Sequence, residues 1–515
     1  TQCPLLTSVA MQSWSLRKCT ASITCLKKSS RWNEALHLLT GMRQCGLQLD
    51  VVVHNEAISA CAAGREWQPA LAVLEGMQRR RLRPSAVTCN ASMSAFQRGR
   101  QWARALQLML DMPRWGLRAS VVTHSAALKA CAEGKQWAGA LQLLHDMHVR
   151  ELRPNVITYN ATISACEKGK RWMHALGTHA AMRRHDIQPD VISYNASMSA
   201  CEKGRQWVQA VLLMDELRDR RLFPDVISYN ALLSALEKGA RWEIALRIRA
   251  SMRDDRVYPD VISHAAVISA CEKSNRWELA LACLAGLPEE RARPNVVAYS
   301  AAISACEKVQ FWEHALALLQ ELERSSAEAN VVSYGAAISA CANGQRWERA
   351  LDLLGQLGRK GLEPNTITCN AAISACEKSG QWQRALRLLV CMKALKIELS
   401  LITYSASISS CERGLNWFAA LSLLEEMQVA ELEPNLAIRG AAVGACEGGG
   451  GTADAPRLLR SISSRASKHL HEETLATPGL LVVAGEQLRW HGFPVASPLA
   501  ALRRRIGGPA LRQCR

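Results

Sequence analysis

Apolar and polar residues alternate along most of the chain with one recurring order. The stretch VISYNASMSACEKG, from Val191 to Gly204, returns with small changes as VITYNATISACEKG from Val156. Its apolar residues fall at i, i+3, i+7 and i+10, which is one face of an α-helix. A second apolar face of the same kind runs from Trp207 to Leu217, and Pro224 then stops it. The pattern predicts two amphipathic helices per unit, the first of which ends at Gly204.

A tryptophan fixes the period of these units. It recurs every 35 residues, and an alanine follows it by three, at Trp32, Trp67, Trp102, Trp137, Trp172, Trp207, Trp242, Trp277, Trp312, Trp347, Trp382 and Trp417. Twelve units therefore run through residues 16–435 without an insertion. Because a two-helix unit cannot bury its apolar face alone, neighbouring units must stack. The sequence predicts an all-α solenoid of about twelve 35-residue helix-turn-helix repeats, in which tryptophan packs against alanine; contact of this pair with a ligand is the alternative.

Polar residues also recur at fixed places, numbered here so that Val191 is position 1 and Asp225 is position 35. Position 5 is most often Asn, which is only a middling helix former. Position 35 is always Asp, Asn or Ser, the residues that best cap a helix N-terminus. Since the Ser or Thr that recurs at position 3 can cap equally well, spacing alone leaves the role of position 35 open between helix cap and ligand contact.

Composition adds a preference for an anionic partner. The formal net charge is +17, which suits nucleic acid. No apolar stretch is long enough to span a membrane. Most of the nineteen cysteines fall singly at position 11, without zinc-site spacing, and are expected to be small buried hydrophobes in a reducing compartment. We find no catalytic motif, no deaminase signature and no sign of a cofactor, so an enzyme is not expected.

The ends of the chain differ from the repeats. Residues 1–15 form an N-terminal segment that is rich in Ser and Thr and lacks acidic residues, which is compatible with the remnant of a transit peptide. Residues 436–470 are expected to form a degenerate capping repeat. Residues 471–515 are basic and are expected to be poorly ordered.

The repeat V-x-[ST]-Y-N…G…A…M…P-[DN] resembles the pentatricopeptide repeat family. The match extends over residues 16–435; the regular Trp at position 17 and Cys at position 11 depart from the common family pattern. The 34-residue tetratricopeptide repeat is the nearest rival, but it lacks the polar pair at positions 5 and 35. The resemblance implies a right-handed superhelix whose first helices bind single-stranded RNA, with one base per repeat.

The resemblance also implies a role for each polar position. Positions 5 and 35 would contact the base edge, through Asn55 and Ser85, Asn90 and Ser120, Ser125 and Asn155, Asn160 and Asp190, Asn195 and Asp225, Asn230 and Asp260, Ser300 and Asn330, Asn370 and Ser400, and Ser405 and Asn435. Position 2 would pack on the base, through Val52, Val87, Val122, Ile157, Ile192, Ile227, Ile262, Val297, Val332, Ile367 and Ile402; simple burial in the core is the alternative. Position 13 would lie near phosphate, through Lys168, Lys203, Lys238, Lys273, Lys308 and Lys378; a solvated helix face is the alternative.

The family's two-residue code converts these pairs into an RNA sequence. Asn with Asp favours U, Asn with Ser favours C, Ser or Thr with Asn favours A, and Thr with Asp favours G. The expected partner is single-stranded RNA of the pattern G-C-C-A-U-U-U-n-A-n-C-A, in which each n follows from a repeat without a polar side chain at position 5 (Ala265 and Gly335). The expected function is processing, stabilisation or translation of an RNA in chloroplast or mitochondrion. A helical-repeat scaffold for protein–protein interaction is the alternative.

Overall fold

Every regular secondary-structure element in the part of the chain that the structure describes is a helix. This computed structural model describes residues 16–29, 31–45, 47, 49–287, 294–325 and 327–449. Among them are 25 α-helices, one short 3-10 helix and no strand. The chain divides into a first unit that ends at Gly414 and a second that begins at Leu415.

Each repeat contributes a first helix that begins at position 1 and ends at position 13. The first helices are α2 (Leu16–Lys28), α4 (Val51–Ala63), α6 (Ala86–Arg98), α8 (Val121–Glu133), α10 (Val156–Lys168), α12 (Val191–Lys203), α14 (Val226–Lys238), α16 (Val261–Lys273), α18 (Val296–Lys308), α20 (Val331–Asn343), α22 (Thr366–Lys378), α24 (Leu401–Arg413) and α26 (Leu436–Gly448).

Each second helix begins at the tryptophan. The second helices are α3 (Trp32–Gln44), α5 (Trp67–Arg79), α7 (Trp102–Asp111), α9 (Trp137–Val149), α11 (Trp172–Arg184), α13 (Trp207–Asp219), α15 (Trp242–Asp254), α17 (Trp277–Ala285), α19 (Trp312–Arg324), α21 (Trp347–Arg359), α23 (Trp382–Ala394) and α25 (Trp417–Val429). The 3-10 helix η1 (Met112–Trp115) extends α7, because Pro113 cannot continue an α-helical hydrogen-bond ladder.

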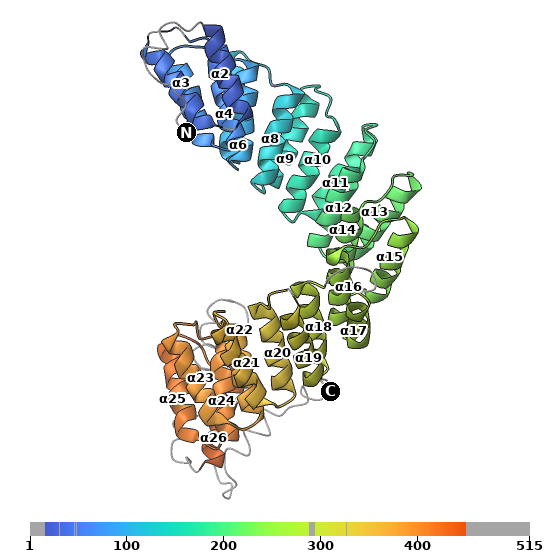
Figure 1. The fold of residues 1–515 in the computed structure, drawn as a ribbon, viewed down its shortest axis with the longest axis vertical. Coiled ribbons are helices and arrows are strands. Elements are labelled where there is room, and N and C mark those ends of the chain that lie inside the picture. Colours follow the sequence, from blue (N-terminus) through green and yellow to red (C-terminus); the bar gives the residue numbers. More distant parts are fainter. Residues whose placement is uncertain are drawn as a thin grey trace, which may run out of the picture. The chain divides into compact units, whose positions relative to one another are not determined.

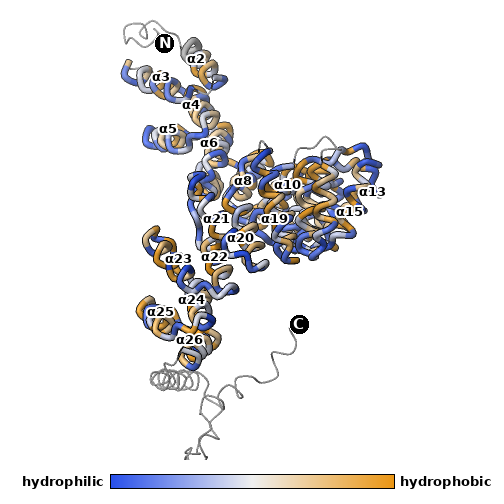
Figure 2. Tube along the Cα trace, turned by 60° about the horizontal axis from the view of Figure 1, so that its bottom comes forward, coloured by the Kyte–Doolittle hydropathy of each residue, from blue (hydrophilic) through white to orange (hydrophobic). Residues whose placement is uncertain are grey.

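Within the first unit the helices form two layers (Figure 1). Each first helix packs against the first helices of the neighbouring repeats. It also packs against the second helix of its own repeat and of the repeat before it; α10, for example, contacts α8, α12, α9 and α11. Figure 2 shows hydrophobic and hydrophilic residues alternating along these helices. The expected all-α solenoid of paired helices is confirmed.

The core consists of the apolar positions that the pattern predicts. Tyr194, Met198 and Cys201 of α12 are buried, as are Ala210 and Met214 of α13. The cysteines at position 11 are buried too, and burial raises the pKa of the Cys131 thiol to about 11. These thiols therefore stay protonated at neutral pH and serve as small apolar side chains, as expected.

The reason for glycine at position 14 differs from the expected one. The first helices do end there, but the left-handed residue that ends them is at position 15; φ is +56° at Arg205 and −84° at Gly204. A Cβ atom added to Gly204 would lie only 2.4 Å from Cδ1 of Trp172 in the preceding repeat. Glycine is needed at Gly204 because the tryptophan occupies the space of its side chain. Where position 14 is glycine, the small partner of the tryptophan is thus in the next repeat; the alanine at position 20, such as Ala175, is fully buried.

Arginine also joins neighbouring repeats at these tryptophans. The guanidinium of Arg171 lies 5.0 Å from the ring centre of Trp137, and that of Arg241 lies 4.8 Å from Trp207. Cation–π contacts of this kind stabilise by roughly 0.5–1 kcal/mol when partly exposed. Tryptophan therefore connects repeats and does more than fill the core of its own repeat.

The second unit contains α25 and α26, which pack against each other. Only the first helix of the segment expected as a capping repeat, residues 436–470, is described. The rest of that segment, residues 1–15 and residues 471–515 lie outside the described residues. None of the helices that the structure does describe is long and apolar enough to cross a lipid bilayer.

Candidate nucleic-acid interface

Position 35 caps the first helix of the following repeat. Asp225 Oδ1 accepts a hydrogen bond of 2.8 Å from the backbone N–H of Ser228, and the backbone N–H of Asp225 donates to Ser228 Oγ at 3.3 Å. This is a capping box, in which the two residues satisfy each other's backbone. The same side-chain cap is made by Asp50, Ser85, Ser120, Asn155, Asp190, Asp260, Asn295, Asn330, Asn365, Ser400 and Asn435. The helix-cap role that spacing left open is therefore confirmed.

A side chain at position 35 that caps a helix can still contact the side chain at position 5 of the preceding helix. Asn195 Nδ2 donates to Asp225 Oδ1 at 3.1 Å. The pairs with the same contact are Asn160 with Asp190 at 3.0 Å, Asn230 with Asp260 at 3.2 Å, Asn55 with Ser85 at 3.4 Å and Asn370 with Ser400 at 3.3 Å. The structure thus brings together five of the nine predicted pairs by this hydrogen bond; in the described part of the chain Asn90 makes no such bond to Ser120.

Ser125 and Ser300 at position 5 make no such contact in the described part of the chain. Ser125 Oγ donates to the backbone carbonyl of Val121 in its own helix at 2.7 Å, and its expected partner Asn155 caps the next helix. Ser300 Oγ is buried without a hydrogen-bond partner among the described residues. Ser405 and Asn435 belong to different units. Within the first unit, the direct hydrogen bond between positions 5 and 35 is therefore made in repeats that have Asn at position 5.

Capping leaves hydrogen-bonding capacity at the pair. Asp225 Oδ1 accepts from Ser228 N and Asn195 Nδ2 and shares the hydroxyl proton of Ser228 with Asn195 Oδ1, while no described residue donates to Oδ2. Asp225 is exposed, and the second Nδ2 proton of Asn195 has no acceptor among the described residues. One carboxylate oxygen and one amide proton are thus available to a ligand.

The Asp carboxylates at position 35 of the three Asn–Asp pairs are ionised at neutral pH. Burial alone would raise the pKa of Asp225, but hydrogen bonds from Ser228 and Asn195 outweigh it and hold the pKa below its usual range. The pKa of Asp190 and that of Asp260 are lowered in the same way. Since an ionised carboxylate only accepts hydrogen bonds, a ligand must present a donor here.

Position 2 forms a column of exposed aliphatic side chains. All eleven predicted residues are more than half exposed, from 52% at Ile157 to 70% at Ile367. Burial in the core, the alternative from the sequence, is wrong. Because positions 2 and 5 are three residues apart on a helix, this column lies beside the polar pair. A regular row of Val and Ile that stays more than half exposed is typical of a surface that contacts a ligand.

The lysines at position 13 form ion pairs between repeats. Lys203 lies 2.7 Å from Glu167, and Lys238 lies 2.8 Å from Glu202. The same contact joins Lys168 to Glu133, Lys273 to Glu237 and Lys308 to Glu272, while Lys378 donates to Asn343. Phosphate would therefore compete with a carboxylate for each of the five paired lysines. This ladder was not predicted from the sequence, although the recurring Glu-Lys at positions 12 and 13 is a signal for it.

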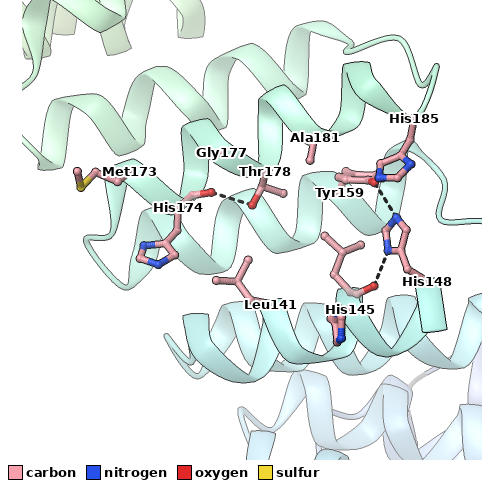
Figure 3. A pocket seen from close by; sticks show the side chains of 11 residues that line it. Leu141, His145, His148, Tyr159, Met173, His174, Gly177, Thr178, Ala181 and His185 are labelled. Atoms are coloured by element: carbon pink, nitrogen blue, oxygen red, sulfur yellow. Dashed lines mark hydrogen bonds between the residues drawn. The ribbon is translucent and has the colours of Figure 1, made fainter. Parts of the chain in front are cut away.

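A pocket lies outside this interface. It measures about 420 Å³ and lies between the second helices α9 and α11 (Figure 3). Histidines line it; the rings of His148 and His185 are 4.5 Å apart, and His148 also contacts Tyr159 Oη and the carbonyl of Leu144. No group of three or more His, Cys, Asp or Glu suited to a metal ion occurs in the described part of the chain.

Comparison with known proteins agrees with the repeat geometry. A family model described as "Pentatricopeptide repeat domain" matches residues 37–98, 107–171, 142–204, 247–308, 317–379 and 352–413, which together span more than half of the chain. Two further models of the same family, "PPR repeat family" and "PPR repeat", match residues 189–238, 227–257 and 297–326. No curated protein is similar enough to the chain to count as a match.

Solved structures with this fold come from the same family. The pentatricopeptide repeat protein PPR10 from maize is 19% identical, with 89% of this chain and 72% of that chain covered and a TM-score of 0.56. PPR10 in complex with an 18-nt psaJ RNA element is 21% identical, with 88% and 67% covered and a TM-score of 0.41. The first similarity supports the solenoid fold, and the family models cover most of the repeats. The chain therefore belongs to the pentatricopeptide repeat family.

Proposed function

We propose that the protein binds single-stranded RNA and selects one base with each repeat. The observation that carries this proposal is the side-by-side placement of positions 5 and 35 next to the exposed column at position 2. An extended strand of RNA presents unstacked bases at regular steps, and each base offers a flat face and a hydrogen-bonding edge. The aliphatic column suits the faces, and the polar pair suits the edges.

The chemistry of the pair accounts for a preference between pyrimidines. The ionised carboxylate at Asp225 accepts from the N3–H of uracil, while cytosine presents an unprotonated N3 there. A Ser hydroxyl at position 35, as at Ser400, also donates and so suits cytosine. Three consecutive repeats carry the Asn and Asp pair, which gives the U-U-U core of the pattern G-C-C-A-U-U-U-n-A-n-C-A.

The biological role that we propose is protection or remodelling of a transcript in chloroplast or mitochondrion. A solenoid bound along a segment of RNA shields that segment from nucleases and prevents it from pairing. Neither effect requires catalysis by this chain, so we propose a binding protein that is not an enzyme.

The proposal is tested by direct binding of the twelve-nucleotide RNA, with U at each n, against a scrambled RNA of the same composition. A mismatch costs about 1 kcal/mol or more at other base-selecting interfaces, so several mismatches should weaken binding at least tenfold. Affinity for both RNAs should fall as salt is added, because phosphate contacts release counterions. Equal affinities would contradict base selection, and no binding at all would favour a scaffold for proteins.

A further inference from the structure

We propose that the Ser or Thr at position 3 of the following repeat is a third specificity-determining residue, because it sets the orientation of the Asn amide at position 5. This inference rests on the proposed base selection. The hydroxyl does not contact the base in this account; it is a positioning residue that decides which end of the amide faces the RNA. Ser228 has this role for Asn195, and Thr403 has it for Asn370.

The sequence links the two positions across the repeat boundary. Each Asn at position 5 is followed in the next repeat by a hydroxyl at position 3; the pairs are Asn55 with Thr88, Asn90 with Thr123, Asn160 with Ser193, Asn195 with Ser228, Asn230 with Ser263 and Asn370 with Thr403. After the first repeat, which has Lys18 at position 3, three repeats lack a hydroxyl there, at Val53, Ala298 and Ile438; they follow Thr20, Ala265 and Ser405. No Asn is left without its hydroxyl.

The structure shows a contact that explains this link. Thr403 Oγ1 donates to Asn370 Oδ1 at 2.7 Å, and Ser228 Oγ donates to Asn195 Oδ1 at 2.6 Å. The other four pairs make the same bond. Where no Asn precedes it, the hydroxyl donates instead to the backbone carbonyl of the capping residue, as from Thr158 to Asn155, Ser333 to Asn330 and Thr368 to Asn365. The hydroxyl therefore turns to the amide whenever an amide is present.

A ring of hydrogen bonds gives this contact its direction. Thr403 Oγ1 accepts from the backbone N–H of Ser400 at 3.1 Å and lies 3.0 Å from Ser400 Oγ. With Ser400 Oγ donating to its second lone pair, Thr403 Oγ1 has only its proton left to offer, and the oxygen of the Asn370 amide accepts that proton whereas the NH₂ group cannot. The amide is thereby held with Oδ1 toward the hydroxyl and Nδ2 toward position 35, where it donates to Ser400 Oγ at 3.3 Å.

The importance of the hydroxyl depends on position 35. In the Asp repeats the carboxylate also requires Nδ2 to face it, and the Ser228 hydroxyl lies 2.7 Å from Asp225 Oδ1 as well as close to Asn195. In the repeats that pair Asn at position 5 with Ser at position 35, the Ser hydroxyl can donate or accept a hydrogen bond. It therefore does not distinguish the two ends of the amide. There the orientation of the amide depends on the whole ring of hydrogen bonds, which the hydroxyl at position 3 completes. The effect of its removal should be largest at Asn55, Asn90 and Asn370.

The test compares Thr403→Val with the unmodified protein on four RNAs that differ only at the nucleotide of the Asn370 repeat, the eleventh of the twelve. Valine has the shape of threonine and already occurs at position 3 as Val53. Loss of the hydroxyl should reduce the ratio between the best and worst base at that nucleotide about fivefold, the effect of one hydrogen bond. The ratios at the other nucleotides should not change.

Two matched variants separate orientation from helix capping. Thr403→Ser keeps the hydroxyl and should keep the ratio. Thr368→Val loses the same capping-box bond, but its hydroxyl donates to the backbone carbonyl of Asn365 and to no amide at position 5, so this variant should keep the ratio too. The inference is overturned if Thr403→Val leaves the ratio unchanged or if Thr368→Val lowers it equally.

A further variant distinguishes failure of this inference from failure of base selection. Asn370→Ala removes the amide itself. If Asn370→Ala abolishes the ratio at the eleventh nucleotide but Thr403→Val does not change it, the role of position 3 is wrong and base selection stands. If neither the unmodified protein nor Asn370→Ala distinguishes the bases, the proposed function fails.

Discussion

Replacing Asn195 with Ser should lower the preference for U over the other bases at the sixth nucleotide of the target by about tenfold, or about 1.4 kcal/mol. The Asn195 amide donates to Asp225 and keeps a second proton for a base. Serine is too short to replace it; at Ser125 the hydroxyl turns back to the carbonyl of Val121. The variant therefore loses both the contact with Asp225 and the donor for the base.

Binding to four RNAs that differ only at this nucleotide measures the effect. The fifth and seventh nucleotides are the internal control, because Asn160 and Asn230 keep their partners Asp190 and Asp260. Their U preference should not change. A loss of affinity that is equal for all four bases, or spread over all three nucleotides, would indicate damage to the fold instead of loss of selection.

Replacing Gly204 with Ala should destabilise the protein by about 2 kcal/mol, in the range for overpacked cores. The new Cβ would lie 2.4 Å from Cδ1 and 2.6 Å from Cγ of Trp172, and a ring cannot move away as a flexible chain end can. An alanine in place of glycine would otherwise stabilise by up to about 1 kcal/mol, since it restricts the unfolded chain. The contact with tryptophan therefore decides whether Gly204→Ala stabilises or destabilises the protein.

Denaturant unfolding and amide exchange in α12 measure this change. Gly177→Ala is the matched control; it makes the same change within α11, where an added Cβ meets nothing within 4 Å, and should stabilise the protein by up to about 1 kcal/mol. Trp172→Leu should reduce the additional cost of Gly204→Ala, because it removes the ring that the new Cβ meets. Equal stability of Gly204→Ala and the unmodified protein would contradict the packing role of this glycine.

The sequence predicted the helices well because their signals are local and occur twelve times. An apolar face from Val191 to Cys201 and a tryptophan at Trp207 mark both helices of a repeat. The partners across repeats were not predicted. The contacts of Trp172 with Gly204, of Lys238 with Glu202 and of Ser228 with Asn195 join residues of adjacent repeats, and the period alone does not say which face meets which.

The sequence predicted which residues of the candidate interface pair with each other, but it did not predict the hydrogen bonds that connect them. The sequence placed Asn195 with Asp225 and set helix capping against base selection as alternatives. In the structure one oxygen of Asp225 makes the cap and the other has no donor among the described residues, so the two roles are compatible. The hydroxyl of Ser228, which joins the cap to the amide, could be assigned only with coordinates.

The most direct test of base selection by single repeats is the binding of Asp225→Ser to RNAs with U or C at the sixth nucleotide. Serine already caps first helices at Ser85, Ser120 and Ser400, so the fold should tolerate it. It replaces an acceptor with a group that also donates, and it creates the pair found at Asn370 and Ser400. The account predicts that the preference changes from U to C at this nucleotide alone; an unchanged preference for U would contradict it.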